Sequence, residues 1–183
     1  LRNDVWSIHD IKHATLRVAP DSTYKIYDAL FGLEEGVITP QDSFIAWNGE
    51  NYPFEAWNAD QTLQSAMASS VNWYFQSVDE QLGTTSVYDY IKEIGYGNKN
   101  MSGDFSTYWM ESSLKISPIE QVELLTQLQN NNFGFAPENI NAVKRFHLPF
   151  FFRCRNILRK DRNRTCGWPG CERMVYRLYR NCR

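Results

Sequence analysis

The chain has 183 residues, 43% of them hydrophobic and 22% charged, so it can bury a sizeable core and form about one domain. No stretch of about 18 apolar residues occurs, which excludes a membrane span within this sequence. The first residues are polar and include neither a Met nor a signal peptide. We therefore expect the chain to be a fragment of a longer protein, and this expectation leaves a membrane anchor upstream of the fragment open.

The net charge of −2 is the sum of two unlike segments. Residues 1–143 carry seven Lys and Arg against nineteen acids, a balance of −12, whereas residues 144–183 carry twelve against two, a balance of +10. The second segment also holds all four cysteines, Cys154, Cys166, Cys171 and Cys182. This contrast predicts a globular domain over 1–144 and a basic, Cys-containing tail over 145–183 that is disordered or non-native.

The first half of the globular segment predicts a helix between two irregular stretches. Residues 4–17 mix polar and apolar side chains around a turn-like middle, which favours an edge hairpin. Apolar residues recur at helical spacing from Ile26 to Leu33, and Gly36 ends that pattern. Residues 39–58 are rich in turn residues and aromatics and predict a long ordered loop with short helical turns.

The second half predicts four more helices. They span Leu63–Leu82, Thr85–Ile94, a segment that begins after Ser117, and a short segment from Pro137 to Val143. Ser117 fits an N-cap, because Pro118 follows it at the first helical position and Glu120 comes three residues later. No internal repeat is present, and the little strand that we expect lies near the N-terminus.

Ser22 and Lys25 form a Ser-x-x-Lys motif at the start of the first predicted helix. This spacing places both side chains on one helix face, where a neutral lysine can take the proton from the serine hydroxyl and make it a nucleophile. The motif alone is weak evidence, because a second copy occurs at Ser112 and Lys115. The simpler interpretation of either copy is a capping serine and a solvated lysine.

The order of the motifs that follow is far more specific. Ser70-Val71-Asn72 comes 45 residues after Lys25, followed by Tyr96-Gly97-Asn98 and then by a segment around Trp109. These motifs, with the strings RVAPDSTYKIYDALFG, YPFEAWNADQTL, SVNWYFQ and ISPIEQVELL, resemble the penicillin-recognising serine proteins with the class D β-lactamase pattern. The resemblance covers about residues 5–144 and is strongest to the penicillin-sensor domain of the membrane-bound β-lactam signal transducers.

The resemblance implies an α+β fold of the serine β-lactamase and penicillin-binding protein (DD-peptidase-like) type, present here mainly as its helical lobe with an incomplete antiparallel sheet. It implies that Ser22 is the nucleophile that opens the β-lactam ring and that Lys25 is its general base. In this family the lysine is often carboxylated by carbon dioxide, and Trp109 resembles the tryptophan that hydrogen-bonds this carbamate. Ser70 would relay a proton to the leaving nitrogen, and the Ser22 N–H would form half of the oxyanion hole.

The same resemblance assigns the remaining site-lining residues. Tyr96, Gly97 and Asn98 match the family's third box, which is more structural than catalytic. Val71 and Asn72 follow the relay serine; class D hydrolases usually have an apolar residue at the position of Asn72, whereas the sensors have Asn or Thr. A polar amide beside Lys25 can compete for the hydrogen bonds of the carbamate. We therefore expect a persistent acyl-enzyme, and this persistence would be the signal.

The ligands and cellular setting implied by the resemblance are those of an antibiotic sensor. β-Lactam antibiotics are the expected ligands, and the rest of a membrane-anchored sensor and protease chain is the expected partner. The site would lie on the extracellular face of the bacterial membrane in the intact parent. Apart from carbon dioxide bound to Lys25, no cofactor, metal or nucleic acid is expected.

The family's Lys-Thr-Gly box, which binds the β-lactam carboxylate, does not occur in this sequence. Codons permitted for residues 145–182, read one nucleotide later, can encode D-S-I-Y-L-S-S-S-D-A-V-T-S-F, G-K-T-G-T-G-R-V-D-G and Q-D-V-N-G-W-F-I-G-Y-I-E-T-A. This shifted-frame reading restores the box and resembles the family's next hairpin. It also accounts for the charge change, the arginines and the cysteines, so we interpret the tail as out of frame.

Other interpretations of the tail are weaker. A zinc site lacks any close Cys-x-x-Cys pair, a nucleic-acid arm rests on the arginines alone, and a disulfide-bonded extension needs an oxidising compartment. Without the strand that carries Lys-Thr-Gly, we expect exposed apolar surface, an unstable or aggregation-prone chain, and negligible acylation.

Two other functional hypotheses remain, a remnant of a secreted class D β-lactamase and a non-catalytic helical interaction domain with a basic arm. Several residues have plainer interpretations. We expect three tryptophans to be core or loop anchors, two histidines to lie on the surface, and one glutamate to cap or pair: Trp47, Trp57, Trp73, His9, His13 and Glu111.

Overall fold

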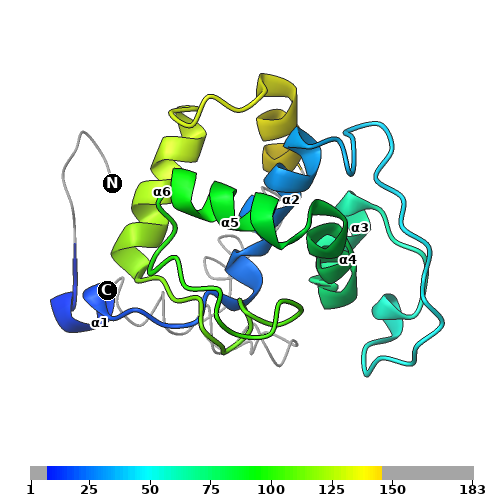
Figure 1. Cartoon of the computed structure of the whole chain (residues 1–183), viewed down its shortest axis with the longest axis horizontal. Coiled ribbons are helices and arrows are strands. Elements are labelled where there is room, and N and C mark those ends of the chain that lie inside the picture. Colours follow the sequence, from blue (N-terminus) through cyan, green and yellow to red (C-terminus); the bar gives the residue numbers. More distant parts are fainter. Residues whose placement is uncertain (1–7, 146–183) are drawn as a thin grey trace, which may run out of the picture.

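The computed structural model describes residues 8–145, which form a helical body (Figure 1). In chain order the helices are α1 (Ile11–Thr15), α2 (Lys25–Glu34), α3 (Leu63–Ser69), α4 (Asn72–Leu82), α5 (Thr84–Glu93) and α6 (Pro118–Gln129). Two short 3-10 turns, η1 (Asp21–Thr23) and η2 (Glu55–Trp57), precede α2 and α3. Residues 137–145 form a last helical stretch.

Helix α2 is the centre of the core. Every residue from Lys25 to Leu33 is buried, because the helix is apolar almost all round and is covered by α4 and α5. Gly32 allows the close approach of α4, since a Cβ at this position would lie 2.6 Å from Cγ1 of Val78. The predicted helix from Ile26 to Leu33 is therefore confirmed, and it is surrounded by the core.

The single helix expected over Leu63–Leu82 is wrong, because the chain breaks at Ser70. Helix α3 ends there with Ser70 in the left-handed region at φ 52°, and α4 begins only after the extended Val71. A left-handed serine is strained, and no Gly or Pro in the sequence signals the break. At this turn the Ser70 carbonyl accepts a tertiary hydrogen bond from Lys25.

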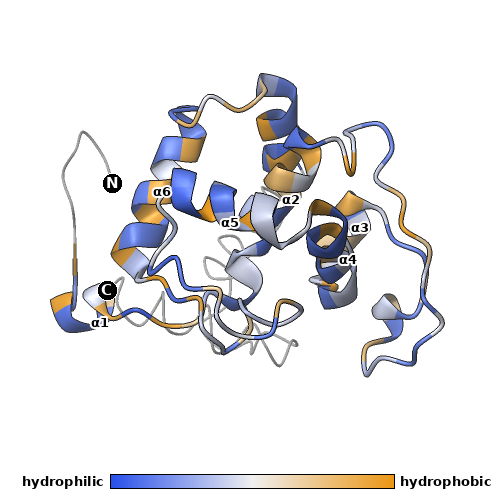
Figure 2. Cartoon of the chain, viewed as in Figure 1, coloured by the Kyte–Doolittle hydropathy of each residue, from blue (hydrophilic) through white to orange (hydrophobic). Residues whose placement is uncertain are grey.

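The outer helices are partly exposed and their ends follow the sequence signals. Helix α5 buries only Val87 and Ile91, and α6 buries only Leu124 and Leu128, so both carry polar and apolar residues (Figure 2). Helix α6 starts with the predicted capping box, in which Ser117 accepts a hydrogen bond from the Glu120 N–H and Glu120 accepts one from the Ser117 N–H. The predicted helices in these regions are confirmed.

The edge hairpin expected over residues 4–17 is wrong within the described chain. Residues 11–15 form the short helix α1, capped by Asp10, and α1 packs beside α6. Strand-like pairing in residues 8–145 is limited to isolated bridges, Val18 with Ile116 and Ile45 with Gln61. The local signal failed because Asp10 offers a helix cap that accepts from the Lys12 and His13 N–H groups. The expected helical lobe with an incomplete sheet is confirmed.

The predicted tail, apart from Arg145, lies outside the described residues, and so do its four cysteines and the shifted-frame segment. Between residues 8 and 145, no helix is long and apolar enough to cross a membrane. The same part of the chain has no cluster of His, Cys, Asp and Glu that could hold a metal ion.

Candidate active site

Ser22 is presented by a tight turn at the head of α2. It lies in η1, where the Tyr24 N–H donates to the Asp21 carbonyl and the Thr23 hydroxyl donates to the Pro20 carbonyl. Asp21 adopts a left-handed φ of 46°, a costly conformation for a non-glycine residue that often marks functional sites. Ser22 is half-buried, so its hydroxyl lies at the edge of the core, directly before the central helix.

Lys25 joins its own Ser-x-x-Lys motif to the Ser70-Val71-Asn72 motif through its side-chain nitrogen. Its Nζ lies 3.2 Å from Ser22 Oγ, 2.8 Å from Ser70 Oγ, and 2.6 Å from Asn72 Oδ1. The Ser70 hydroxyl also donates to Ser22 Oγ at 2.8 Å. The two serines and the lysine thus form a closed triangle, assembled from residues 48 positions apart. A nucleophile within hydrogen-bond reach of a base is the arrangement that acyl-serine chemistry requires.

Burial tunes Lys25 toward the neutral amine. Its side chain is 2% exposed, and desolvation lowers its pKa to about 7, although the negative charges of Asp28 and Asp21 oppose this shift. The Nζ atom lies 5.6 Å from the ring centre of Phe75 and 5.5 Å from that of Trp109. A lysine with this pKa has a substantial neutral fraction near pH 7, which a base must have.

The left-handed turn at Ser70 also turns its backbone carbonyl toward Lys25, whose Nζ donates to it at 2.7 Å. Trp57 supports this turn, because its indole N–H donates to the Ser69 carbonyl at 3.0 Å. The Trp73 indole donates in turn to the Trp57 carbonyl. Trp57 and Trp73 are confirmed as anchors, and so is Trp47, whose indole donates to the Glu50 carbonyl. The contact of the Ser70 carbonyl with Lys25 could not be predicted from local sequence patterns, because it depends on the strained turn.

Asn72 lies between Lys25 and the segment that carries Trp109. While Oδ1 accepts from Lys25, Nδ2 donates to Met110 Sδ at 3.1 Å, so the orientation of the amide is fixed. Val71, between the two polar residues, is fully buried in the core. The structure therefore brings Asn72 to the lysine and directs Val71 away from solvent.

Trp109 is buried, and its ring centre lies 5.5 Å from Lys25 Nζ. Its ring stacks against Tyr24 with centroids 6.0 Å apart, and its carbonyl accepts from the Asp21 N–H. The Glu111 N–H donates to Asp21 Oδ1, which adds a second link between the Ser22 turn and this segment. Glu111 therefore contributes a backbone pairing contact, while the exposed His9 and His13 are confirmed as surface residues.

Tyr96, Gly97 and Asn98 hold a loop junction, and within the described part of the chain no hydrogen bond joins them to Lys25. The Asn98 N–H donates to the Lys115 carbonyl, its Oδ1 accepts from the Lys115 N–H, and its Nδ2 donates to the Ser113 carbonyl. Gly97 has φ 47°, and a Cβ there would clash with the Lys115 carbonyl. Tyr96 is fully buried and packs edge-on against Tyr24.

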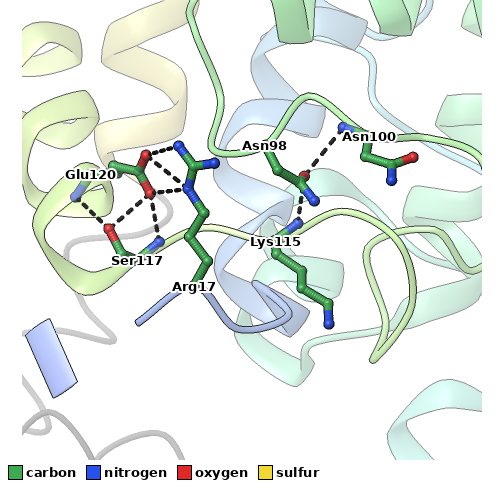
Figure 3. A network of polar contacts seen from close by, with 6 residues as sticks. All are labelled: Arg17, Asn98, Asn100, Lys115, Ser117 and Glu120. Atoms are coloured by element: carbon green, nitrogen blue, oxygen red, sulfur yellow. Dashed lines mark hydrogen bonds and ion pairs between the residues drawn. The ribbon is translucent and has the colours of Figure 1, made fainter. Parts of the chain in front are cut away.

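The second Ser-x-x-Lys copy has none of this geometry. Ser112 and Lys115 lie in the loop before α6, and the Lys115 side chain is exposed. Beside this loop, Arg17 forms an ion pair with Glu120, which also accepts a hydrogen bond from the Ser117 hydroxyl (Figure 3). Arg17 lowers the pKa of Glu120 to about 2, so this outer network is fully ionised at neutral pH.

A serine one turn before a buried lysine, with a second serine in contact with both, is the Ser-x-x-Lys arrangement typical of β-lactamases and penicillin-binding proteins. The family model of the penicillin binding protein transpeptidase domain matches residues 9–164, and the chain belongs to this family. The predicted membership and fold are confirmed. The matched segment extends beyond the residues that the structure describes.

Among its relatives, the chain is 47% identical over 139 residues to the regulatory protein BlaR1 of Bacillus licheniformis, covering 76% of this chain and 23% of that protein. The solved C-terminal domain of the B. licheniformis BlaR penicillin receptor matches with 46% identity and a TM-score of 0.73, over 75% of this chain and 55% of that one. The class D β-lactamase BAT-2 delta mutant matches with 35% identity and a TM-score of 0.76, over 79% and 62%. The chain thus spans about a quarter of BlaR1.

Proposed function

We propose that this chain is the core of a β-lactam-sensing domain, whose signal is the covalent acylation of Ser22. The contact that carries this proposal is the triangle of Ser22, Lys25 and Ser70, with the Asn72 amide oxygen 2.6 Å from the same lysine. The similarity to a regulatory protein and to a penicillin receptor supports a sensor.

The proposed reaction uses distances within this triangle. Ser22 Oγ attacks the carbonyl carbon of the β-lactam, and its proton passes to neutral Lys25, directly over 3.2 Å or through Ser70 Oγ. The C–N bond of the ring then breaks, and Ser70 delivers a proton to the nitrogen that leaves. The Ser22 N–H, at the head of α2, donates one hydrogen bond to the oxyanion.

Persistence of the acyl-enzyme depends in this proposal on Asn72. Carbon dioxide can add to the neutral amine of Lys25, and the resulting carbamate would be the base that activates a deacylating water. The amide oxygen of Asn72 accepts a hydrogen bond from the amine at 2.6 Å, so this amide can compete for the hydrogen bonds of the carbamate. We therefore propose that Lys25 remains largely uncarboxylated after acylation and that the ester survives.

A second candidate, the hydrolytic class D β-lactamase, is favoured by the similarity to BAT-2. The two candidates differ in the fate of the ester, because a hydrolase releases the antibiotic and a sensor retains it. The third candidate, a helical interaction domain with a basic arm, depends on residues outside the described chain. Bound zinc, or DNA affinity that falls steeply with salt, would favour it.

The proposed cellular setting follows from the sensor function. We propose that the site faces the outside of the bacterial membrane and that acylation is transmitted to the rest of a membrane-anchored sensor and protease chain. A β-lactam is the proposed ligand, and no metal takes part. The chain itself spans about a quarter of BlaR1, so the setting of the whole protein is part of this proposal.

The test is labelling with a fluorescent penicillin, followed by gel electrophoresis. We expect negligible labelling of the chain as it stands, because Lys-Thr-Gly is absent from its sequence. We expect stoichiometric labelling when residues 145–182 are replaced by the shifted-frame reading, and none when that version also carries Ser22→Ala. An unlabelled shifted-frame version that folds, or label that survives Ser22→Ala, would contradict the proposal.

A further inference from the structure

Two carboxyl groups, Asp28 and Asp79, lie buried beneath Lys25. Asp28 is 0% exposed and Asp79 is 1% exposed, although carboxylates are strongly hydrated when they are free. Asp28 follows Lys25 by three residues on α2, so both lie on the same face of that helix. Asp79 comes from α4, which packs directly against α2. The core thus contains acidic groups to which the family resemblance assigned no role.

The hydrogen bonds of this pair require a proton. The Tyr108 hydroxyl lies 3.1 and 3.2 Å from the two Asp79 oxygens and 2.6 Å from the Tyr24 hydroxyl. Neither Asp28 oxygen accepts a hydrogen bond from a donor among the described residues, and the group beside burial that acts most strongly on the Asp28 carboxyl is Asp79. Two adjacent buried carboxylates repel each other, so one of them must hold a proton that the other accepts.

The pKa shifts agree with this geometry. Burial raises the pKa of Asp28 well above its usual range, and the charge of Asp79 raises it further. Burial also raises the pKa of Asp79 to about 7, while the hydrogen bonds from Tyr108 and Asp28 lower it. The proton therefore belongs to the pair and not to either carboxyl alone. Near neutral pH the pair carries at most one negative charge.

The first contacts of the Lys25 amine are uncharged. Within the described residues its hydrogen-bond acceptors are the hydroxyls of Ser22 and Ser70, the Ser70 carbonyl and the Asn72 amide, and it forms no ion pair. The charge that acts on it comes from acids behind this shell, chiefly Asp28 and then Asp21. The remaining titratable groups that act on the pair are Glu80, Tyr24, Tyr74 and Tyr108.

We propose that Asp28 and Asp79 share one proton, and that the single negative charge left on the pair holds Lys25 as an ammonium ion until solvent removes its proton. The two acids are thus positioning residues that act through Lys25, and this inference rests on the proposed function. Only the neutral amine can take the proton of Ser22, so the charge of the pair sets the pH above which Ser22 becomes reactive.

The test is a pH titration of the full chain labelled with ¹⁵N-lysine, followed by NMR, with Lys25→Met used to assign the signal. In Asp28→Asn or Asp79→Asn alone, the remaining carboxyl can carry the charge, so we expect a small shift of the Lys25 midpoint. In the double variant no carboxyl remains, and we expect the midpoint to fall by about one pH unit or more. Glu80→Gln is the matched control, because it removes an exposed acid next to Asp79 and leaves the pair intact.

A non-additive fall of the midpoint supports a shared proton. An unchanged midpoint in the double variant, or shifts of the single variants that simply add, would overturn the proposal. If the double variant does not fold, infrared spectroscopy of the unaltered chain decides. A protonated carboxylic acid band near pH 7 that Asp28→Asn removes is expected, and absence of the band overturns the proposal. Neither measurement uses penicillin. A failure of this proposal is therefore distinct from a failure of Ser22 to become acylated.

Discussion

Two junctions hold the candidate site, and they are built in opposite ways. The inner junction, between α2 and α4, is made of buried side chains that include Lys25, Asp28 and Asp79. The outer junction joins residues 96–98 to the loop before α6 through hydrogen bonds of the backbone and of Asn98, and the partly exposed Arg17–Glu120 ion pair lies beside that loop (Figure 3). Acids of the inner junction have raised pKa values, whereas the pKa of Glu120 is lowered to about 2.

This difference shows how location decides what a charge contributes. In the inner junction, desolvation is the largest effect on each ionisable group. It raises the pKa values of Asp28 and Asp79 and lowers the pKa of Lys25. In the outer junction, a hydrogen bond from an arginine is the largest effect, and solvent screens it. We therefore assign the proposed acylation chemistry to the inner junction, while the outer junction positions the neighbouring loops through backbone hydrogen bonds.

The largest effect is expected from Gly97→Ala in the outer junction. The new Cβ would meet the Lys115 carbonyl, which is backbone and cannot move aside, and the φ of 47° adds strain. We expect a loss of about 3 kcal/mol or more in the free energy of unfolding, measured by urea denaturation. Gly95→Ala is the control, because Gly95 has a similar φ of 71° and open space around it, so only about 1 kcal/mol should be lost. Equal losses would contradict the clash.

The inner junction predicts a dependence of stability on pH. The pKa of Asp79 is about 7 in the folded chain and 3.8 in the unfolded one, so the folded state binds more protons between these values. The contribution of Asp79 to stability is therefore fully present below pH 3.8 and falls as pH rises toward 7, by about 2 kcal/mol. Urea denaturation at pH 5 and 7 measures the fall, and Asp28→Asn/Asp79→Asn should flatten it. A rise over this range would show that the acids are not buried.

A smaller effect is expected from Gly32→Ala, also in the inner junction. The added methyl group would lie 2.6 Å from Val78 Cγ1, but this neighbour is a side chain that can shift. Thermal unfolding should show a loss of about 1 to 2 kcal/mol. Val78→Ala in the same chain should recover part of that loss, whereas additive losses would mean that the two positions do not collide.

The smallest effect is expected from Arg17→Gln. The ion pair with Glu120 is partly exposed, so its loss should cost about 0.5 kcal/mol, and less at high salt. Glu120→Ala should cost more, because Glu120 also completes the capping box with Ser117. Chemical denaturation at two salt concentrations separates the two contributions, and a larger loss from Arg17→Gln would reverse this assignment.

Local signals predicted most of the helical lobe. The capping box at Ser117 and the apolar spacing of Ile26–Leu33 are encoded within a few residues, and both helices formed as expected. The break at Ser70 could not be predicted in this way, because its left-handed turn is stabilised by Trp57 and Lys25, which are distant in the sequence. The hairpin expected near the N-terminus failed because Asp10 caps a helix instead.

The candidate site was predicted unevenly. Ser22, Lys25, Ser70 and Asn72 were singled out by the order of their motifs, and the structure brings all four together. The Asp28–Asp79 pair was not predicted, since its members are 51 residues apart and meet only through the packing of α2 on α4. An acid within the apolar pattern from Ile26 to Leu33 was the one signal available for Asp28.

The most direct measurement follows the mass of the shifted-frame version over time after one equivalent of penicillin, by intact-protein mass spectrometry. The sensor function predicts a mass increase of one intact penicillin on Ser22 that persists for hours, and no increase in the Ser22→Ala variant. Rapid return to the starting mass with release of hydrolysed penicillin would contradict it and favour a β-lactamase. Absence of any adduct on a folded chain would contradict acylation itself.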